Sequence, residues 1–114
     1  LEPKSRKYEL LESFYNLVII NYKENRTVAY YADKLFVTSK YLSRISRELD
    51  VKHRSAKEWI DDYSITEIKL LLKSTTLSVQ SISEQLNFPN LSFFSKFFKS
   101  RTGITPTQYR TEHS

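Results

Sequence analysis

Hydrophobic residues along this chain recur every three or four positions, which is the spacing of one helix face. In the segment at about 5–22, that face carries Leu10, Leu11, Phe14, Leu17 and Val18. Polar residues at 21–27 then interrupt the pattern. The same spacing predicts further helices at about 28–35, 39–49, 56–73, 79–86 and 90–101, and a short one that starts at Pro106. One glycine and three prolines leave little material for hairpin turns, so we predict an all-α fold of seven helices.

Residues at the expected helix ends have the chemistry of helix caps. Thr38 or Ser39 can accept an amide hydrogen bond at the start of the third helix. Ser55 and Glu58 stand at the start of the fourth helix with the spacing of a capping box. Gly103 follows the sixth helix, at a position that favours a positive φ. These residues support the helix boundaries independently of the hydrophobic pattern.

The segments at 29–47 and 78–99 form an internal repeat. Apolar residues match at an offset of 51 positions before an expected turn and at an offset of 52 after it. Small residues, Ala32 and Ser83, match on the first helix of each copy, where two helices approach closely. The matched apolar pairs are Tyr31 and Ile82, Leu35 and Leu86, Val37 and Phe88, Leu42 and Phe94, and Ile45 and Phe97. The repeat predicts two helix-turn-helix units, a motif whose second helix enters the major groove of DNA.

The helix expected at 56–73 lies between the two repeated units. At ~1.5 Å per residue it spans about 27 Å, and successive major-groove faces of DNA are roughly 34 Å apart. We therefore predict that one chain reads two adjacent major-groove segments. The predicted organisation is a first helix-turn-helix subdomain at 1–55, a linker helix at 56–73 and a second subdomain at 74–114.

The charge of the chain fits a polyanionic partner. It has 18 Lys and Arg residues against 13 Asp and Glu residues, a net charge of +5 and a pI near 9.4. Many other small domains are basic, so charge alone decides nothing. For the repeat, the alternative is an ordinary helical bundle with accidental periodicity. Arg44 and Lys96 stand at the same point of the second helix in the two repeated units, and this agreement favours DNA.

The composition argues against an enzyme or a metal protein. The sequence has no cysteine, and its two histidines, His53 and His113, lie far apart. A single glycine cannot make a glycine-rich phosphate loop. We therefore expect no catalysis, no cofactor and no metal. The longest aliphatic run, at 17–20, is too short for a membrane span, and we expect a cytoplasmic protein.

The stretch at 78–110 closely resembles the signature segment of the AraC family of bacterial transcription regulators. The shared motifs are Ser92-Phe93-Phe94, Phe98-Lys99, Thr102-Gly103, Thr105-Pro106 and Tyr109-Arg110. The first repeated unit is similar to the family's first helix-turn-helix. The resemblance implies a seven-helix domain, with two helix-turn-helix units joined by a rigid helix, that binds specific DNA sequences and regulates transcription, as an activator rather than a repressor.

The resemblance also implies partners for the chain. These are double-stranded DNA and, because an activator works on transcription initiation, RNA polymerase. In the family a separate sensing or dimerisation domain usually precedes this one. We therefore expect any effector ligand to act through a domain that this sequence does not contain.

The sequence departs from the family pattern at four places. The segment at 50–54 is about two residues longer than usual and lacks the family's glycine. Ser46 stands near a usual Phe, and Ser64 stands where the family often has Arg. Asn87 replaces a common Gly in the second turn, which is tolerable because Asn adopts positive φ more readily than most residues.

The resemblance assigns the base-reading surface by position. The candidates are Ser39, Lys40, Ser43, Arg44 and Arg47 on the first recognition helix, and Asn90, Leu91, Ser92, Ser95 and Lys96 on the second. Arg44 is the strongest candidate, because Arg can bond guanine O6 and N7 as a bidentate pair. For Asn90, a plain role as helix N-cap is an equal alternative.

A second set of candidates is expected to contact phosphate groups. It consists of Thr38, Lys52, Arg54, Lys99 and Thr105. Phosphate contacts make DNA binding weaken steeply as salt concentration rises. The alternative for the whole chain is a helical protein-interaction module with no direct DNA reading, whose apolar interface would respond weakly to salt.

Overall fold

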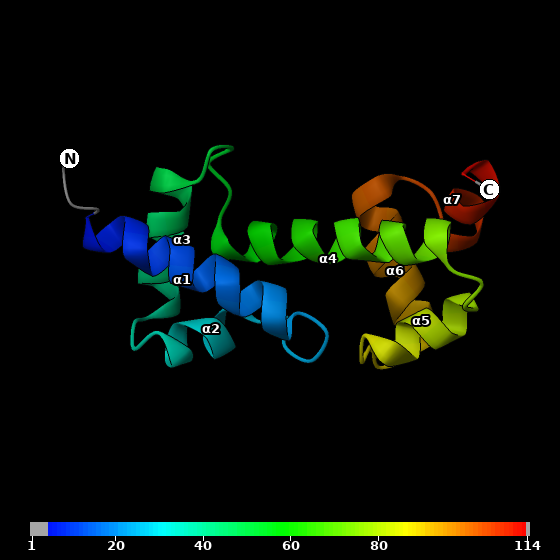
Figure 1. The fold of residues 1–114 in the computed structure, drawn as a ribbon, viewed down its shortest axis with the longest axis horizontal. Coiled ribbons are helices and arrows are strands. Elements are labelled where there is room, and N and C mark those ends of the chain that lie inside the picture. Colours follow the sequence, from blue (N-terminus) through cyan, green and yellow to red (C-terminus); the bar gives the residue numbers. More distant parts are fainter. Residues whose placement is uncertain (1–4, 114) are drawn as a thin grey trace. The chain divides into compact units, whose positions relative to one another are not determined.

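The computed structural model describes residues 5–113, and the chain is helical throughout this range apart from its connections (Figure 1). The elements are α1 Arg6–Asn21, α2 Val28–Lys34, α3 Ser39–Leu49, α4 Ala56–Ser74, α5 Val79–Gln85, α6 Leu91–Thr102 and α7 Pro106–Glu112. Each begins within about one residue of its predicted start, and the first six end within about one residue of their predicted ends. The predicted all-α fold of seven helices is therefore confirmed for the described residues.

The chain divides into two compact units, which cover residues 1–63 and 64–114 and are called the first and second unit below. The first unit contains α1, α2, α3 and the beginning of α4. The second contains the rest of α4 together with α5, α6 and α7. The helix predicted as a separate linker thus contributes residues to both units.

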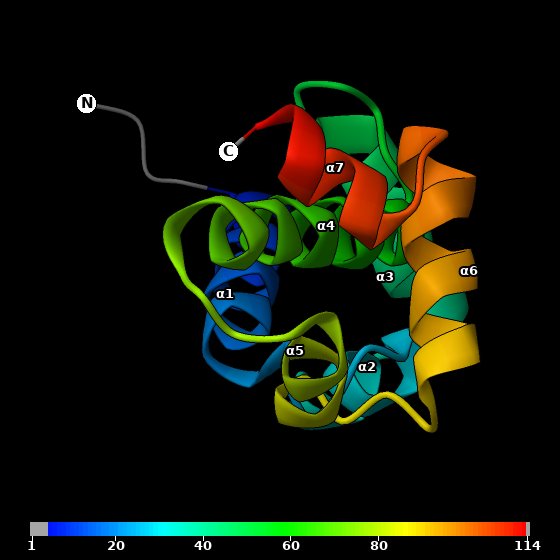
Figure 2. The same ribbon diagram turned by 90° about the vertical axis from the view of Figure 1, so that its right-hand side faces the viewer.

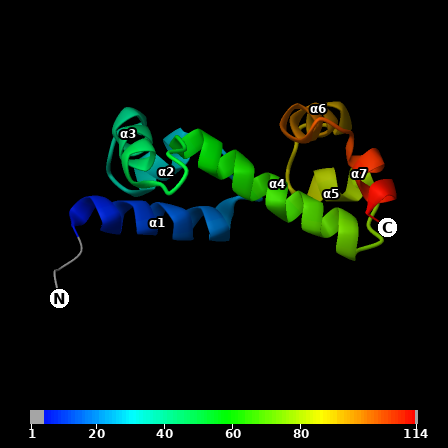
Figure 3. The same ribbon diagram turned by 90° about the horizontal axis from the view of Figure 1, so that it is seen from above.

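In the first unit, α1 packs against α2 and α3 (Figure 3). Phe14 of α1 is fully buried and meets the ring of Tyr31 edge-on, with 5.7 Å between the ring centroids. The indole of Trp59 stacks on Tyr15 at 4.2 Å and on Tyr63 at 5.7 Å, which ties α1 to α4. Aromatic contacts of this kind give the small unit a core, because each ring buries a large apolar area.

In the second unit, α6 and α7 lie side by side, and α5 packs against α6 (Figure 2). Phe94 and Phe98 of α6 are fully buried, and Tyr109 of α7 meets Phe98 edge-on at 5.6 Å. The guanidinium of Arg110 donates to the carbonyl oxygens of Leu72 at 3.0 Å and Thr75 at 3.4 Å. Arg110 therefore caps the carboxyl end of α4 and holds α7 against it.

The caps predicted at three helix ends are confirmed. Thr38 accepts a hydrogen bond from the N–H of Tyr41 at the start of α3. The Ser55 hydroxyl accepts from the N–H of Glu58, and the Glu58 carboxylate accepts from the N–H of Ser55, which completes a capping box. Gly103 ends α6 with a φ of 86°. In the described part of the chain, no helix combines the length and the apolar character that crossing a membrane requires.

Candidate nucleic-acid interface

The two repeated segments, at 29–47 and 78–99, make the same backbone turn between their helices. In the first, the N–H of Val37 donates to the carbonyl of Ala32 at 3.0 Å. In the second, the N–H of Phe88 donates to the carbonyl of Ser83 at 3.1 Å. Ala32 and Ser83 are both 2% exposed, which explains the small residues at these positions, since a larger side chain would push the paired helices apart. The donors and the acceptors of these two hydrogen bonds are thus separated by the same 51 positions that relate the two segments in the sequence.

Each turn also contains a residue in the left-handed region. Phe36 has a φ of 59° and Asn87, which matches it in the repeat, has a φ of 57°. Asn87 thus adopts the positive φ that the sequence analysis expected it to tolerate. The positive φ of Phe36 was not expected from the sequence, because an aromatic residue rarely adopts it. Phe36 is also 95% exposed, so its ring has no part in the core.

After the turn, the repeat continues at the caps of the second helices. Thr38 accepts from the N–H of Tyr41 at 3.0 Å, and Asn90 accepts from the N–H of Phe93 at 2.8 Å. The expectation that Asn90 acts as an N-cap is confirmed. Its side-chain oxygen is occupied in this way, whereas its NH₂ group is a further donor. The matched caps make α3 and α6 equivalent helices in their units.

The outward face of α3 is basic. Ser39, Lys40, Arg44 and Arg47 are exposed and Ser43 is half-buried, whereas Leu42 and Ile45 on the opposite face are fully buried. Within residues 5–113, no ion pair engages the three cations. They line a hollow of about 460 Å³ together with Thr38 and Tyr41. The face therefore offers charge without an internal partner, as a surface for a polyanion requires.

Tyr41 is a residue of this face that the sequence analysis missed. The guanidinium carbon of Arg44 lies 5.2 Å from the centroid of the Tyr41 ring. Stacking of this kind restrains a flexible side chain. The i, i+3 spacing of an aromatic residue and an arginine on one helix was the available signal.

The outward face of α6 has fewer charges. Asn90, Leu91, Ser92, Lys96 and Lys99 are exposed, and Ser95 is half-buried. No ion pair engages the two lysines within the part of the chain that the structure describes. Lys96 stands where α3 has Arg44, and Lys99 stands where α3 has Arg47. The second helix thus has the same layout as the first, with lysines in place of arginines.

Arg54, predicted as a phosphate contact, forms ion pairs inside the first unit. Its Nε lies 2.9 Å from Asp50 Oδ2, and its Nη2 donates to Asp50 Oδ1 at 3.2 Å. Nη1 reaches Asp62 at 3.4 Å, and the guanidinium lies over Trp59 at 6.0 Å. With all three nitrogens engaged and the side chain 23% exposed, Arg54 has a structural role in the first unit. Its contact with a phosphate group stays a prediction.

Asp50 is the centre of this cluster and is 3% exposed. Its carboxylate also accepts from the hydroxyl of Tyr15 at 2.6 Å and from the backbone N–H groups of Lys52 and Arg54. Burial raises the pKa of Asp50, but the hydrogen bonds from Arg54, Tyr15 and the backbone outweigh it and hold the pKa well below its usual range. Burial and the bond to Asp50 raise the pKa of Tyr15. Asp50 therefore stays ionised and fixes the connection that follows α3.

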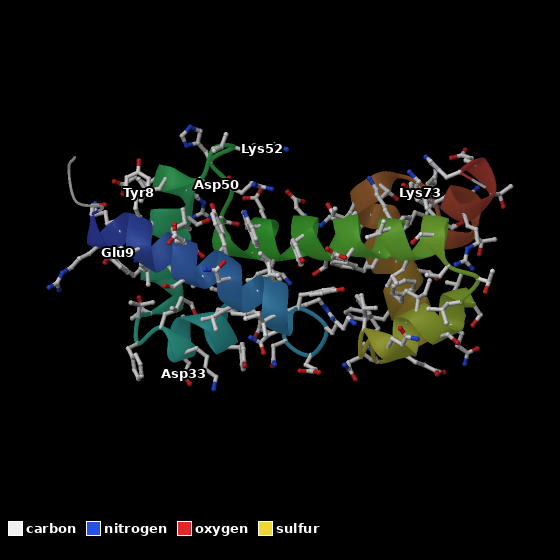
Figure 4. The ribbon with its side chains drawn as sticks, in the orientation of Figure 1. Tyr8, Glu9, Asp33, Asp50, Lys52 and Lys73 are labelled. Carbon is white, nitrogen blue, oxygen red and sulfur yellow. The ribbon has the colours of Figure 1, made fainter. Side chains whose placement is uncertain are left out.

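The connection between α3 and α4 exposes the remaining candidate of the first unit. Lys52 is exposed, and Figure 4 shows it at the tip of this connection. His53 has a φ of 54°, and its Nδ1 lies 2.9 Å from the carbonyl of Arg47 near the end of α3. In the second unit, Thr105 caps α7 in a capping box with Gln108 and is half-buried. The phosphate roles of Thr38, Lys52, Lys99 and Thr105 stay predictions.

Among residues 5–113, no group of three or more His, Cys, Asp or Glu side chains is arranged to hold a metal ion. These two helix faces offer polar and basic side chains that can contact phosphates and bases.

A family model of the helix-turn-helix domain, of the AraC type, matches residues 31–112. This chain belongs to the AraC-type helix-turn-helix family. The family consists of DNA-binding transcription regulators. The matched range covers both turns described above and both helices that follow them.

Several curated AraC-type relatives are much longer than this chain. The Msm operon regulatory protein of Streptococcus mutans is 33% identical over 81 residues, which is 71% of this chain and 28% of that protein. The arabinose operon regulatory protein of Escherichia coli is 32% identical over 56 residues, which is 49% of this chain and 19% of that protein. The chain spans less than a third of the length of each of these curated relatives.

Two solved structures resemble the fold. The C-terminal domain of AraT, a response regulator from Geobacillus stearothermophilus, has a TM-score of 0.80 and 26% identity, covering 95% of this chain and 88% of that chain. The C-terminal domain of the two-component response regulator yesN from Fusobacterium nucleatum has a TM-score of 0.74 and 28% identity, covering 93% of this chain and 99% of that chain.

Two departures from the AraC-type pattern, at Ser46 and in the connection at 50–54, have structural explanations. His53 adopts the left-handed conformation in the lengthened connection that lacks glycine. Ser46 is fully buried and donates to the carbonyl of Arg54 at 2.7 Å, which ties α3 to the same connection. Ser64 is also fully buried, in α4. The lengthened connection is therefore held by side-chain hydrogen bonds at Ser46, Asp50 and His53.

Proposed function

We propose that this chain binds specific sequences of double-stranded DNA and regulates transcription, with α3 and α6 each reading one segment of the major groove. The observation that carries the proposal is the exposed face of α3, where Lys40, Arg44 and Arg47 form no ion pair within residues 5–113. This face follows a turn closed by a hydrogen bond from Val37 to Ala32, and the matching bond from Phe88 to Ser83 closes the turn before α6. A helix presented in this way after a tight turn is the reading element of helix-turn-helix proteins.

The proposed roles follow from side-chain chemistry. Arg44 would bond guanine O6 and N7, helped by the Tyr41 ring that restrains it. The other proposed base readers are Ser39, Lys40, Ser43, Arg47, Asn90, Leu91, Ser92, Ser95 and Lys96. The proposed phosphate contacts are Thr38, Lys52, Arg54, Lys99 and Thr105.

The regulatory part of the proposal rests on relatives. We propose an activator, since the transcriptional activator NphR of Rhodococcus is 29% identical over 73 residues, which is 64% of this chain and 22% of that protein. As an activator, the DNA-bound chain would contact RNA polymerase. An effector would act through a further domain, as the greater length of the relatives suggests. We propose a bacterial cytoplasmic protein with no enzymatic activity.

The test is selection from a pool of randomised duplexes, followed by sequencing of the bound fraction. The intact chain should select a motif in two parts. Arg44→Ala should lose the preference for guanine in one part, by roughly 5- to 150-fold, which corresponds to ~1–3 kcal/mol for a bidentate contact. Arg44→Lys is the matched variant, because it keeps the charge and removes the fork geometry.

Arg44→Lys should retain affinity and lose most of the guanine preference. A selected pool without any motif, together with an affinity that ignores salt, would contradict DNA reading. The face of α3 would then belong to a protein-interaction module.

A further inference from the structure

The amino end of α6 exposes two apolar side chains. Leu91 is 42% exposed and Phe93 is 55% exposed. At the matching positions α3 has Ser39 and Tyr41, which is half-buried and lies under a guanidinium. The two recognition helices therefore share a backbone layout but differ in the chemistry they offer to a base edge.

The exposure of these two residues is not needed for folding. The start of α6 is capped by Asn90, and its buried face is made by Phe94 and Phe98. Phe93 touches the core at its margin, where its ring lies 6.3 Å from that of Phe88. An apolar side chain on a surface that faces DNA contributes most to binding where it contacts an apolar group of the DNA, because that contact removes apolar surface from water.

Base edges in the major groove offer one such group, the C5-methyl of thymine. The cations of α6 are lysines, which can bond guanine but lack the rigid planar fork of Arg. Leu91 and Phe93 are therefore the side chains of α6 whose chemistry matches thymine.

We infer that α6 selects thymine through Leu91 and Phe93, whereas α3 selects guanine through Arg44, so that the two parts of the operator differ in composition. The inference rests on the proposed function. It makes Leu91 and Phe93 specificity-determining residues of the second unit. Each acts by covering a thymine methyl group, so the preference does not depend on charge.

The experiment replaces thymine by deoxyuridine in the selected duplex, in one part of the motif at a time. This change removes a methyl group and leaves base pairing and the protein intact. We expect about fourfold weaker binding for each contacted methyl group in the part read by α6, as for ~0.8 kcal/mol per buried CH₂. In the part read by α3, the same replacement should change affinity less than about twofold.

Leu91→Ala should bind the original duplex more weakly and lose part of its sensitivity to deoxyuridine. The matched control is Leu70→Ala, which truncates an exposed leucine of the second unit that lies on α4. Leu70→Ala should keep the full sensitivity. A change in stability alone cannot imitate this result, because sensitivity is a ratio measured on one protein.

The outcomes separate this inference from the proposed function. Failure to select any motif would contradict the proposed function itself. A two-part motif in which deoxyuridine has no effect, or in which the part read by α6 has no thymine, would leave DNA reading in place and overturn the role of Leu91 and Phe93.

Discussion

At the scale of single residues, Asp50 has the most concentrated set of interactions in the first unit. Its carboxylate is buried and accepts hydrogen bonds from Tyr15, from the guanidinium of Arg54 and from two backbone N–H groups. Removing one partner of a buried charge pair leaves the other uncompensated, which is why such changes cost more than the pair itself is worth. Asp50 therefore holds α1, the end of α3 and the connection to α4 in one arrangement.

We predict that Asp50→Asn lowers the free energy of unfolding by ~2–3 kcal/mol at pH 7. The folded-state pKa of Asp50 is held below its unfolded value, so the stabilisation is full above about pH 5 and is lost as the pH falls through about 4 and below. Urea unfolding at a series of pH values would measure the difference between the two proteins. That difference should shrink as the pH falls.

The control for this series is Asp33→Asn, at an exposed position on α2 (Figure 4). It should change the free energy of unfolding by less than ~0.5 kcal/mol at any pH. A difference between Asp50→Asn and the parent chain that stays constant from pH 7 to pH 3 would show that the Asp50 charge does not stabilise the fold.

At the scale of elements, the helix caps were the most predictable feature. Asn90 is the N-cap of α6, and its side-chain oxygen accepts a hydrogen bond from the N–H of Phe93. A cap contributes ~1 kcal/mol, because it satisfies an amide that the helix leaves without a partner. The same residue is a proposed base reader through its NH₂ group, so its two roles need separate measurements.

Two substitutions of Asn90 separate these roles. Asn90→Ala should lower the free energy of unfolding by ~1 kcal/mol, whereas Asn90→Ser should keep it within a few tenths, because serine also caps well. Asn90→Ser should nevertheless lose the preference for one base pair in the selected motif. If Asn90→Ser selects the same motif as the parent chain, Asn90 is a cap and nothing more.

Local features account for what the sequence predicted well. Helix bounds depend on neighbouring residues, and caps such as Thr38, Ser55 and Gly103 act over three or four positions. The cluster around Asp50 could not be predicted in this way, because Tyr15 lies 35 positions away and nothing in its neighbourhood marks it as a partner. The partners of Arg54 could not be predicted for the same reason, since a basic residue in a loop has the same local sequence whether it faces DNA or a buried carboxylate.

At the scale of the whole molecule, charge is the property that matters for DNA. The net charge of +5 attracts any polyanion, whereas contacts with individual phosphates require cations on the docked face. These two contributions respond differently to substitution. Removing a lysine that contacts a phosphate changes how steeply affinity depends on salt concentration. Removing a distant lysine changes only the overall electrostatic field of the molecule.

We predict that Lys99→Ala reduces the slope of log affinity against log salt concentration by about 0.9, which is the value for one phosphate contact. The matched variant is Lys73→Ala, which removes the same charge from the last turn of α4 (Figure 4). It should leave the slope almost unchanged. Titrations of one selected duplex at several salt concentrations give both slopes. Equal decreases in the two variants would mean that net charge, and not the face of α6, sets the affinity.

The left-handed residues have a consequence for recognising proteins of this kind. Phe36, His53 and Asn87 take positive φ values without glycine, and the two turns still form the same hydrogen bonds. A search pattern that demands glycine in these turns would overlook both units. Such repeated turns are better detected by aligning hydrogen-bonded positions than by comparing residue types, because residues other than glycine adopt the positive φ here.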